Sequence, residues 1–480
     1  MRLRLKALMI LVLLLPILTA AQAIRGYGEE ATNSVDAIER YRKGDVVLRL
    51  LDDVGRPISG ASIIYKQTNR DFLFGIASGG VPLSSLQEAG INYVEVYASW
   101  KATQYPGAGA LGTAYLAAMR NLGFVLSGHC LVWMVGSYPS IPGADPWNLP
   151  YEVKTLKYEQ LKEELYDHVY MTVNEYKSFI KYWDINEPFW RYGDPFNLNS
   201  AQWIEIIRLS VDAIKKADPE AKIYMNNLIG DFPTLGYYPI SNMKLLMDMD
   251  IDFDAIGLEL YGDNRSPGVP LSGNYPELSW VSDRLDQFGK LGKPIILTEV
   301  GVTTVPNQKA QAEWLKRAYT IAFGKPYIKG VAWTFALDDP FLPNGGLFEQ
   351  SGQPRQSFYA LKNLTDSWLT EGSGTTDGEG ALRFRGFAGN YSIRVTTDGI
   401  EPFETAIYLQ EQVENQFEIS MPKKTTPTTA TVTSSILQSS VTSSNASSLP
   451  QQEVYAVGIA VLASCLMIVL GVKRLRRKTR

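Results

Sequence analysis

A carboxylate at the end of an apolar segment is the first feature of this chain that could do chemistry. The segment 180–187 ends in Asn186 and Glu187, and Pro188 follows. Proline has no N–H to donate and ends a strand, so the amide and the carboxylate are expected at the C-terminal lip of a buried strand. A single glutamate in that position fits ordinary solvation as well as acid catalysis. A catalytic interpretation therefore needs a partner carboxylate.

A second carboxylate, Glu299, stands near the end of another apolar segment, 294–301. Two carboxyl groups facing each other across a cleft can hydrolyse a glycosidic bond, because one protonates the leaving oxygen while the other attacks or activates water. Carboxyl groups about 5–5.5 Å apart retain the anomeric configuration. We predict that spacing for Glu187 and Glu299. The charge of ionised Glu299 would raise the pKa of Glu187 and keep its proton available.

The elements that must position these carboxylates form a repeating strand–helix pattern between residues 71 and 369. Eight such units imply an α/β fold with a closed (β/α)8 TIM barrel, whose chemistry lies on the loops after the strands. The alternative is an open doubly wound sheet, although no glycine-rich phosphate fingerprint follows the first strand. Strands are expected at 72–77, 91–97, 124–132, 180–187, 222–228, 255–261, 294–301 and 329–337, and helices at 114–122, 151–177, 201–217, 279–291, 309–322 and 356–368.

Aromatic residues at other strand ends suggest a carbohydrate site. His129 and Trp133 lie at the end of the third strand, and Trp333 lies in the eighth. A flat indole beside two carboxylates suits the apolar face of a sugar ring. A structural hydrogen bond for His129 and core packing for either tryptophan remain the alternatives.

Residues 41–368 resemble glycoside hydrolase family 10, the retaining endo-β-1,4-xylanases. The resemblance rests on ordered blocks: Gly-His-Cys-Leu-Val-Trp at 128–133, Trp-Asp-Ile-Asn-Glu-Pro at 183–188, Leu-Thr-Glu at 297–299 and Gly-Leu-Phe at 346–348. It implies a (β/α)8 barrel with Glu187 as general acid/base and Glu299 as nucleophile. It also implies Asn186 as a partner of the sugar 2-hydroxyl, and His129, Trp133 and Trp333 as walls of the sugar subsites.

The chain departs from the family pattern in two strands. The block Glu-Asn-x-Met-Lys-Trp aligns with residues 95–100, which keep Glu95 but replace the asparagine and the lysine that bind the neighbouring sugar. In the sixth strand Gln-Ser-His aligns with Glu259-Leu260-Tyr261. Tyr261 could donate to Glu299 in place of the missing histidine, or simply pack. Glu259 is either a third carboxylate in the cleft that binds a hydroxyl, or a group behind Glu299.

The ends of the chain predict export and a membrane anchor. Residues 1–23 combine basic residues, a short apolar run and a small-residue cleavage pattern, which is typical of a signal peptide. Residues 423–452 form a Ser/Thr-rich stalk, and 453–472 are expected to be a transmembrane helix because the run 454–472 is uncharged and long enough to cross a bilayer. Residues 473–480 form a basic cytoplasmic tail. We therefore expect a single-pass protein of the cell membrane with an extracellular catalytic domain.

A small β domain is predicted from two distant parts of the chain, 45–66 and 370–422. Strands are expected at 45–52, 60–65, 381–387, 390–395, 405–409 and 416–419, with the glycine-rich segment 372–380 before the third. Both parts resemble a carboxypeptidase-regulatory-type β-sandwich. We hypothesise that the barrel is inserted into one sandwich built from both ends; the alternative is an N-terminal hairpin that only caps the barrel floor.

Composition excludes several other classes. Two histidines and two cysteines in 480 residues offer no transition-metal constellation and no disulfide framework, and no cofactor is expected. A pI near 5.6 disfavours a nucleic-acid partner. The sequence thus predicts a retaining glycoside hydrolase that cleaves β-1,4-linked polysaccharide or oligosaccharide, first of all xylan. The alternatives are a β-glucanase or β-mannanase of the same clan, or a catalytically silent surface protein that binds glycans.

Overall fold

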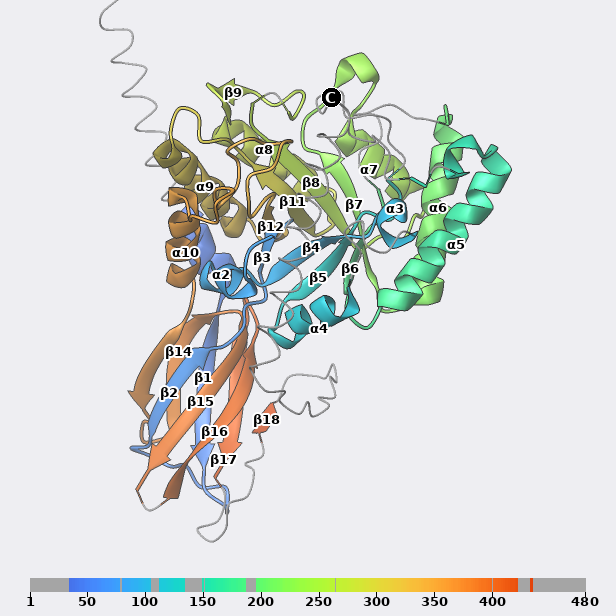
Figure 1. Ribbon diagram of the computed structural model, residues 1–480. Helices are drawn as coiled ribbons and strands as arrows, with labels where there is room; N and C mark the ends of the chain where they lie inside the picture. Colours follow the sequence, from blue (N-terminus) through green and yellow to red (C-terminus); the bar gives the residue numbers. More distant parts are fainter. Residues whose placement is uncertain are drawn as a thin grey trace, which may run out of the picture. The chain divides into compact units, whose positions relative to one another are not determined.

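The computed structural model describes residues 34–77, 80–104, 112–133, 149–150, 152–186, 196–263, 265–398, 400–421 and 432–434 (Figure 1). All of them belong to one compact unit, residues 1–434. Glu187, the predicted signal peptide, the membrane segment 453–472 and most of the stalk lie outside the described residues. Within the described ranges, no helix is both long and apolar enough to cross a membrane.

The middle of the chain forms a closed barrel of eight parallel strands. They are β3 (Leu73–Ile76), β4 (Tyr93–Tyr97), β5 (Val125–His129), β6 (Tyr182–Asp184), β7 (Lys222–Leu228), β8 (Ala255–Tyr261), β11 (Ile295–Gly301) and β12 (Ile328–Trp333). Sequential strands are neighbours, and β12 pairs with β3 to close the ring. This closure confirms the predicted barrel and excludes the open doubly wound sheet.

Helices surround the barrel (Figure 1). The six predicted helices are present, although the segment at 151–177 begins with a 3-10 turn, η1 (Glu152–Thr155). Asn199 illustrates how a helix starts: its side chain accepts a hydrogen bond from the backbone N–H of Gln202 at the N-terminus of α6. The helices are α2 (Leu83–Glu88), α3 (Trp100–Gln104), α4 (Thr113–Asn121), α5 (Tyr158–Tyr176), α6 (Ser200–Ala217), α7 (Pro239–Asp248), α8 (Leu278–Gly289), α9 (Gln308–Gly324) and α10 (Gln356–Ser367).

Alternation along each barrel strand separates the core from the site. In β8, Ile256, Leu258 and Leu260 belong to the main core cluster, whereas Glu259 and Tyr261 lie on the opposite face, toward the barrel interior. The polarity of the barrel interior changes from its floor to its mouth. Its floor is a small apolar cluster that includes Leu73, Tyr93, Ile296 and Ala332. The polar residues described below lie nearer the carboxyl ends of the strands, where a barrel of this kind carries its chemistry.

Strands from both ends of the chain form two four-stranded sheets. β1 (Lys43–Leu51) lies between β14 (Ala381–Phe387) and β17 (Glu414–Ser420), with β18 (Val432–Ser434) at the edge. β2 (Ser62–Gln67) lies between β13 (Glu371–Thr375) and β15 (Gly389–Thr397), and β16 (Ile400–Leu409) follows. The sheets share one apolar cluster, so they pack face to face. This pairing between the two ends is what the insertion hypothesis requires.

One segment of the β domain differs from expectation. β13 occupies residues that the sequence assigned to a glycine-rich segment before the strands. Glycine serves packing here: a Cβ on Gly372 would come within 2.5 Å of the Tyr65 hydroxyl, and one on Gly374 within 2.5 Å of Leu382. The small residues allow β13 to pair with β2 while bulky neighbours cross it.

A buried arginine joins the beginning of the chain to the barrel. Arg42 donates to the carbonyl oxygens of Phe323, Lys325 and Ile328 at 2.6, 2.5 and 2.7 Å, between the last turn of α9 and the start of β12. Burial lowers the pKa of Arg42 to about 10, so it remains charged at neutral pH. Its remaining charge is met by Glu411 at 3.4 Å.

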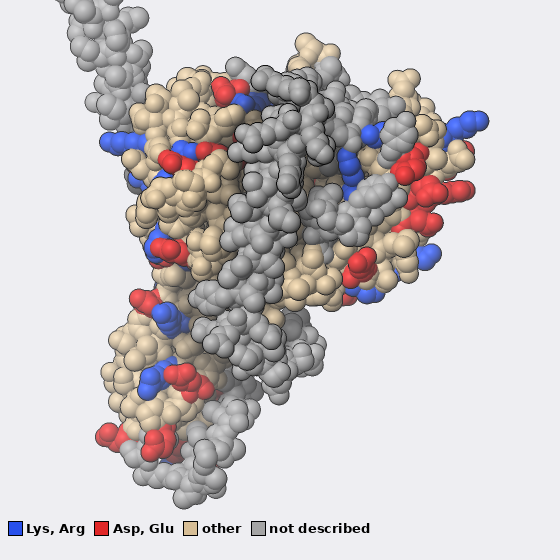
Figure 2. Space-filling view, in the orientation of Figure 1, with Lys and Arg blue, Asp and Glu red and all other residues tan. Residues whose placement is uncertain are grey.

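Charge on the surface is mixed. On the face in Figure 2, the basic and acidic side chains of the described residues are interspersed over the barrel and the β domain. The formal net charge of the chain is −4.

Candidate active site

Glu299 lies near the carboxyl end of β11, where the strand is irregular. The pairing of β11 with β8 shifts register between Leu297 and Glu299. Such an irregularity re-aims the side chains that follow it. The carboxylate keeps 12% of its side-chain surface exposed, in contrast to the buried Thr298 before it. Glu299 is therefore the accessible acid of this strand.

Tyr261 makes the contact with Glu299 that the sequence suggested. Its hydroxyl donates to Glu299 Oε2, and its ring is buried edge-to-face against Phe341 at 5.2 Å. The Ser266 hydroxyl accepts from the Tyr261 backbone N–H at 2.8 Å and holds the strand end. Donation and packing are therefore combined in one residue. A donor to an ionised carboxylate stabilises the charged form, which is the form that a nucleophile needs.

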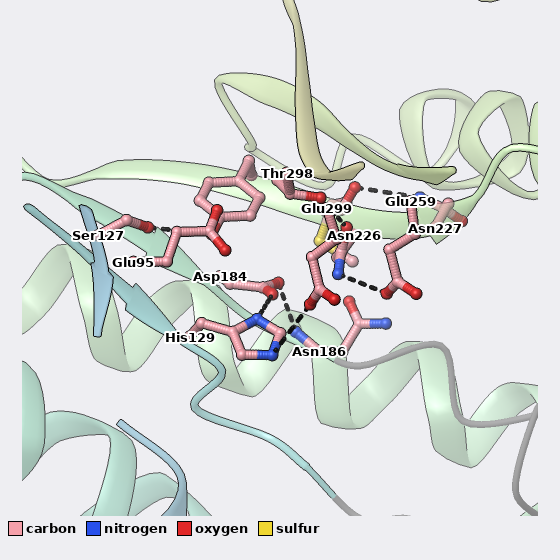
Figure 3. Close-up of polar contacts among 12 residues, drawn as sticks. Glu95, Ser127, His129, Asp184, Asn186, Asn226, Asn227, Glu259, Thr298 and Glu299 are labelled. Carbon is pink, nitrogen blue, oxygen red and sulfur yellow. Dashed lines mark hydrogen bonds and ion pairs between the residues drawn. The ribbon is translucent and has the colours of Figure 1, made fainter. Parts of the chain in front are cut away.

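His129 connects Glu299 to a buried aspartate (Figure 3). Its Nδ1 lies 2.8 Å from Asp184 Oδ2, and its Nε2 lies 3.5 Å from Glu299 Oε1. Asp184 Oδ1 also accepts from the Asn186 backbone N–H at 3.1 Å. Burial raises the pKa of Asp184 well above its ordinary value, and the nearby Glu259 raises it further. The Asp184 contact orients the imidazole so that its other nitrogen faces the candidate nucleophile.

Glu95 is a second buried acid on the barrel interior. Its Oε1 accepts from Tyr93 and Tyr224 hydroxyls at 2.9 and 3.4 Å, while Oε2 has no hydrogen-bond partner among the described residues. Burial is the main cause that raises the pKa of Glu95 to about 8; Asp184 adds to the effect and His129 opposes it. The carboxyl is therefore mostly protonated at pH 7 and can both donate and accept.

Glu259 is completely buried beside the site. Its Oε1 accepts from Asn226 Nδ2 at 2.9 Å, and Thr298 Oγ1 donates to Asn226 Oδ1 at 2.8 Å. The pairing of β8 with β11 sets Glu259 level with Glu299. Full burial favours the interpretation of Glu259 as a group behind the nucleophile rather than an open hydroxyl-binding acid, and its charge reaches Asp184.

The remaining predicted residues differ in their surroundings. Asn186 is buried at the end of the β6 segment and bridges to Val132, and Figure 3 places its amide beside the Glu299 and Glu259 side chains. Trp133 is 6% exposed, with its ring 5.5 Å from that of His129. Trp333 is 0% exposed and donates to Gly345 O at 2.8 Å, so it is buried, and its role as a subsite wall stays a prediction. The spacing of Glu187 from Glu299 stays a prediction.

Asp184, Asn226, Tyr224 and Tyr93 were not singled out from the sequence. Each lies in a barrel strand, on the same face as the site. A polar residue that interrupts a buried strand at the inward period-two positions was the available signal. Asp184 was part of a recognised block, but its role depends on His129, which lies 55 residues away in sequence and on the neighbouring strand β5.

Two groups of side chains could in principle surround a cation. They are His129 with Cys130 and Asp184, and His129 with Glu95 and Glu299, whose candidate ligand atoms lie within 4.8 Å of one another. Both groups depend on His129. Its contacts with Asp184 and Glu299 also fit a histidine that is held by one carboxyl group and interacts with the other, with no cation between them.

Comparison with known proteins assigns the family. The family model described as glycosyl hydrolase family 10 matches residues 109–364, just over half of the chain. The chain therefore belongs to glycosyl hydrolase family 10.

Individual relatives are distant. The chain is 24% identical to the anti-sigma-I factor RsgI6 of Acetivibrio thermocellus, over 76% of this chain and 46% of that protein. It is 25% identical to endo-1,4-beta-xylanase 1 of Arabidopsis thaliana, over 75% of this chain and 37% of that protein. The chain thus spans less than half the length of these two relatives. The crystal structure of xylanase 10B from Thermotoga maritima superposes with a TM-score of 0.46 at 18% identity, covering 62% of this chain and 95% of that one.

Proposed function

We propose that this protein is a retaining glycoside hydrolase that cleaves β-1,4-linked polysaccharide, xylan first of all. The observation that carries the proposal is the setting of Glu299: an accessible carboxylate at the barrel mouth, held by the Tyr261 hydroxyl and faced by His129. Membership of the family and the similarity to proteins named endo-1,4-beta-xylanases support it.

The proposed reaction has two displacements. In the first, Glu299 attacks the anomeric carbon, the glycosidic bond breaks, and Glu187 gives its proton to the leaving oxygen. In the second, Glu187 takes a proton from water, the water oxygen attacks the anomeric carbon, and the ester bond to Glu299 breaks. The sugar leaves with its original configuration, and both carboxyl groups return to their starting states.

The surrounding residues prepare Glu299 for these steps. The Tyr261 hydroxyl and the His129 imidazole stabilise negative charge on its two oxygens, and Asp184 fixes the imidazole. Glu95 and Asn186 are the polar groups we assign to sugar hydroxyls. A protonated Glu95 would bind a hydroxyl without adding a second negative charge beside the nucleophile.

The test is a panel of xylan, β-glucan and β-mannan with the wild-type chain and two variants. We expect reducing sugar from xylan, and losses of more than about 10³-fold in Glu299→Gln and in Glu187→Gln. Glu404→Gln, which changes an exposed glutamate of the β domain, serves as the matched control. Proton NMR of the first product should show the β anomer. An α anomer, or near-normal turnover by Glu299→Gln, would refute the mechanism, and preference for another polymer would revise the substrate.

A second candidate function is a catalytically silent glycan-binding protein. Two observations favour it: a similar protein is named an anti-sigma-I factor, and Val96 and Ser99 replace polar residues of the family pattern. In that case oligosaccharides would bind without turnover on any β-glycan, and Glu299→Gln would bind as the wild type does.

We also propose that the protein is tethered to the cell membrane through residues 453–472, with the barrel outside the cell. The uncharged apolar run 454–472, the basic residues 473–480 after it and the signal-like N-terminus support this arrangement. The two sheets of the β domain support its assignment to the carboxypeptidase-regulatory type. Protease added to intact cells should remove the barrel and leave a membrane-bound fragment; a barrel that is protected in intact cells would contradict the topology.

A further inference from the structure

Among the described residues, Tyr97 is an exposed aromatic residue at the mouth of the barrel. It is the last residue of β4, and 40% of its surface is exposed. Alternation along the strand puts Tyr93, Glu95 and Tyr97 on the interior face, from the apolar floor upward. Val96 faces the other way and packs against the main core. Tyr97 is therefore the residue nearest the barrel mouth in the inward-facing row Tyr93, Glu95 and Tyr97.

Two neighbouring rings hold Tyr97 in place. β4 and β5 pair so that Tyr97 stands beside His129, with ring centroids 5.9 Å apart at 64°. The Trp133 ring is nearly parallel to the Tyr97 ring, with centroids 6.3 Å apart at 22°. The Ala98 N–H donates to His129 O at 2.6 Å and fixes the end of β4. Trp133 is almost fully buried and backs this cluster, while Tyr97 keeps 40% of its surface exposed.

The position of this surface relative to Glu299 defines what it can contact. His129 lies between them, with one edge 3.5 Å from Glu299 and its ring next to Tyr97. A sugar whose anomeric carbon faces Glu299 would therefore lie over His129, and the next sugar of the chain would reach Tyr97. Of the described residues that follow Glu95 in this segment, Val96 is turned outward and Ser99 is 1% exposed, so neither offers a polar group to that sugar.

We propose that Tyr97, backed by Trp133, is a stacking platform for the sugar next to the bond-cleaving position, and that it determines specificity through the apolar face of that sugar. The inference rests on the proposed function, because it takes Glu299 as the reacting group. An aromatic face binds the axial C–H groups of a β-linked pyranose with equatorial hydroxyls. Stacking depends on the shape of the sugar ring and tolerates changes in its hydroxyl groups. A set of directional hydrogen bonds would not tolerate such changes.

The test compares two substrates that differ by one sugar, an aryl β-xyloside and an aryl β-xylobioside. In the wild type the second sugar should raise kcat/KM. In Tyr97→Ala we expect this gain to fall roughly ten- to thirtyfold, mainly through KM, while the single-sugar substrate changes by less than about twofold. Tyr97→Phe should keep most of the gain because the ring remains. Tyr359→Ala removes a 50% exposed tyrosine from α10 and should behave as the wild type.

Binding to xylotriose in the Glu299→Gln background separates failure of this inference from failure of the proposed function. If the wild type cleaves nothing but Tyr97→Ala weakens binding, hydrolysis is refuted and the platform stands. If Tyr97→Ala cleaves and binds as the wild type does, the platform is refuted and hydrolysis stands. An equal loss on both aryl glycosides would show a structural role and also refute the platform. Failure of the wild type to bind or cleave any of these sugars would refute both.

Discussion

Replacement of Glu95 by glutamine should change how the stability of the protein depends on pH. Glu95 is 2% exposed, and burial raises its pKa from 4.5 to about 8. The folded protein therefore keeps a proton on Glu95 at pH values where the unfolded chain has lost it. Linkage then requires that stability falls as pH rises between about 4.5 and 8. Below this window both states are protonated, and above it both are ionised.

The size of the effect follows from the two pKa values. The interval from 4.5 to about 8 corresponds to roughly 5 kcal/mol, at about 1.4 kcal/mol for each pH unit. Glutamine resembles the protonated acid in shape and cannot ionise, so Glu95→Gln removes this loss. The stability of the variant minus that of the wild type should therefore rise by up to roughly 5 kcal/mol between pH 4.5 and 8.

Urea denaturation followed by tryptophan fluorescence, in half-unit steps from pH 4 to 8.5, measures this difference directly. Comparison of the two proteins at each pH cancels the groups that they share. Glu404→Gln, on the exposed surface of the β domain, provides a matched control with the same glutamate-to-glutamine substitution. A wild-type-minus-variant difference that does not vary with pH would show that Glu95 is not a buried, protonated acid and would refute the reasoning.

Three further changes have defined outcomes. Tyr261→Phe removes the donor to Glu299 and should lower kcat/KM on xylan roughly 10- to 100-fold, the expected loss of a hydrogen bond to a charged group. Burial lowers the pKa of His168 from 6.5 to about 4, so the wild type should lose roughly 3 kcal/mol of stability as pH falls through that interval. In acid titrations His168→Gln should lack this slope. Arg42→Met leaves three carbonyl oxygens without their buried donor and should lower the free energy of unfolding by about 2–4 kcal/mol in urea.

Controls and contrary results are specific to each change. Unchanged kcat/KM in Tyr261→Phe, at unchanged Tm, would show that its hydroxyl does not support the nucleophile. Parallel acid titrations of wild type and His168→Gln would mean that His168 titrates normally. For Arg42→Met the matched variant is Arg394→Met, an exposed arginine of β15. Equal free energies of unfolding for the two variants would show that the Arg42 hydrogen bonds to the α9–β12 region do not stabilise the fold.

Much of the fold could be predicted because the barrel strands are buried on both faces. Such strands read as near-continuous apolar runs, and helices with one apolar face alternate with them. β7, β8 and β14 were predicted at their observed ends. β13 was not, because its glycines resemble a turn until Tyr65 and Leu382 are seen to cross them. The insertion of the barrel into the β domain could only be a hypothesis from the sequence. It depends on the pairing of β1 with β14, which joins residues more than 300 positions apart.

The sequence by itself determined which side chains stand at strand ends, and hence the acidic, aromatic character of the mouth. Glu299, His129 and Tyr261 could be named as candidates because the carboxyl ends of all barrel strands meet on one side. Only the tertiary structure decided their partners: Asp184 for His129, Asn226 for Glu259, and the Tyr93 and Tyr224 hydroxyls for Glu95. Burial was decided there as well. Trp333 is buried and Tyr97 is exposed, because exposure depends on what neighbouring strands place in front of a ring, which no local pattern contains.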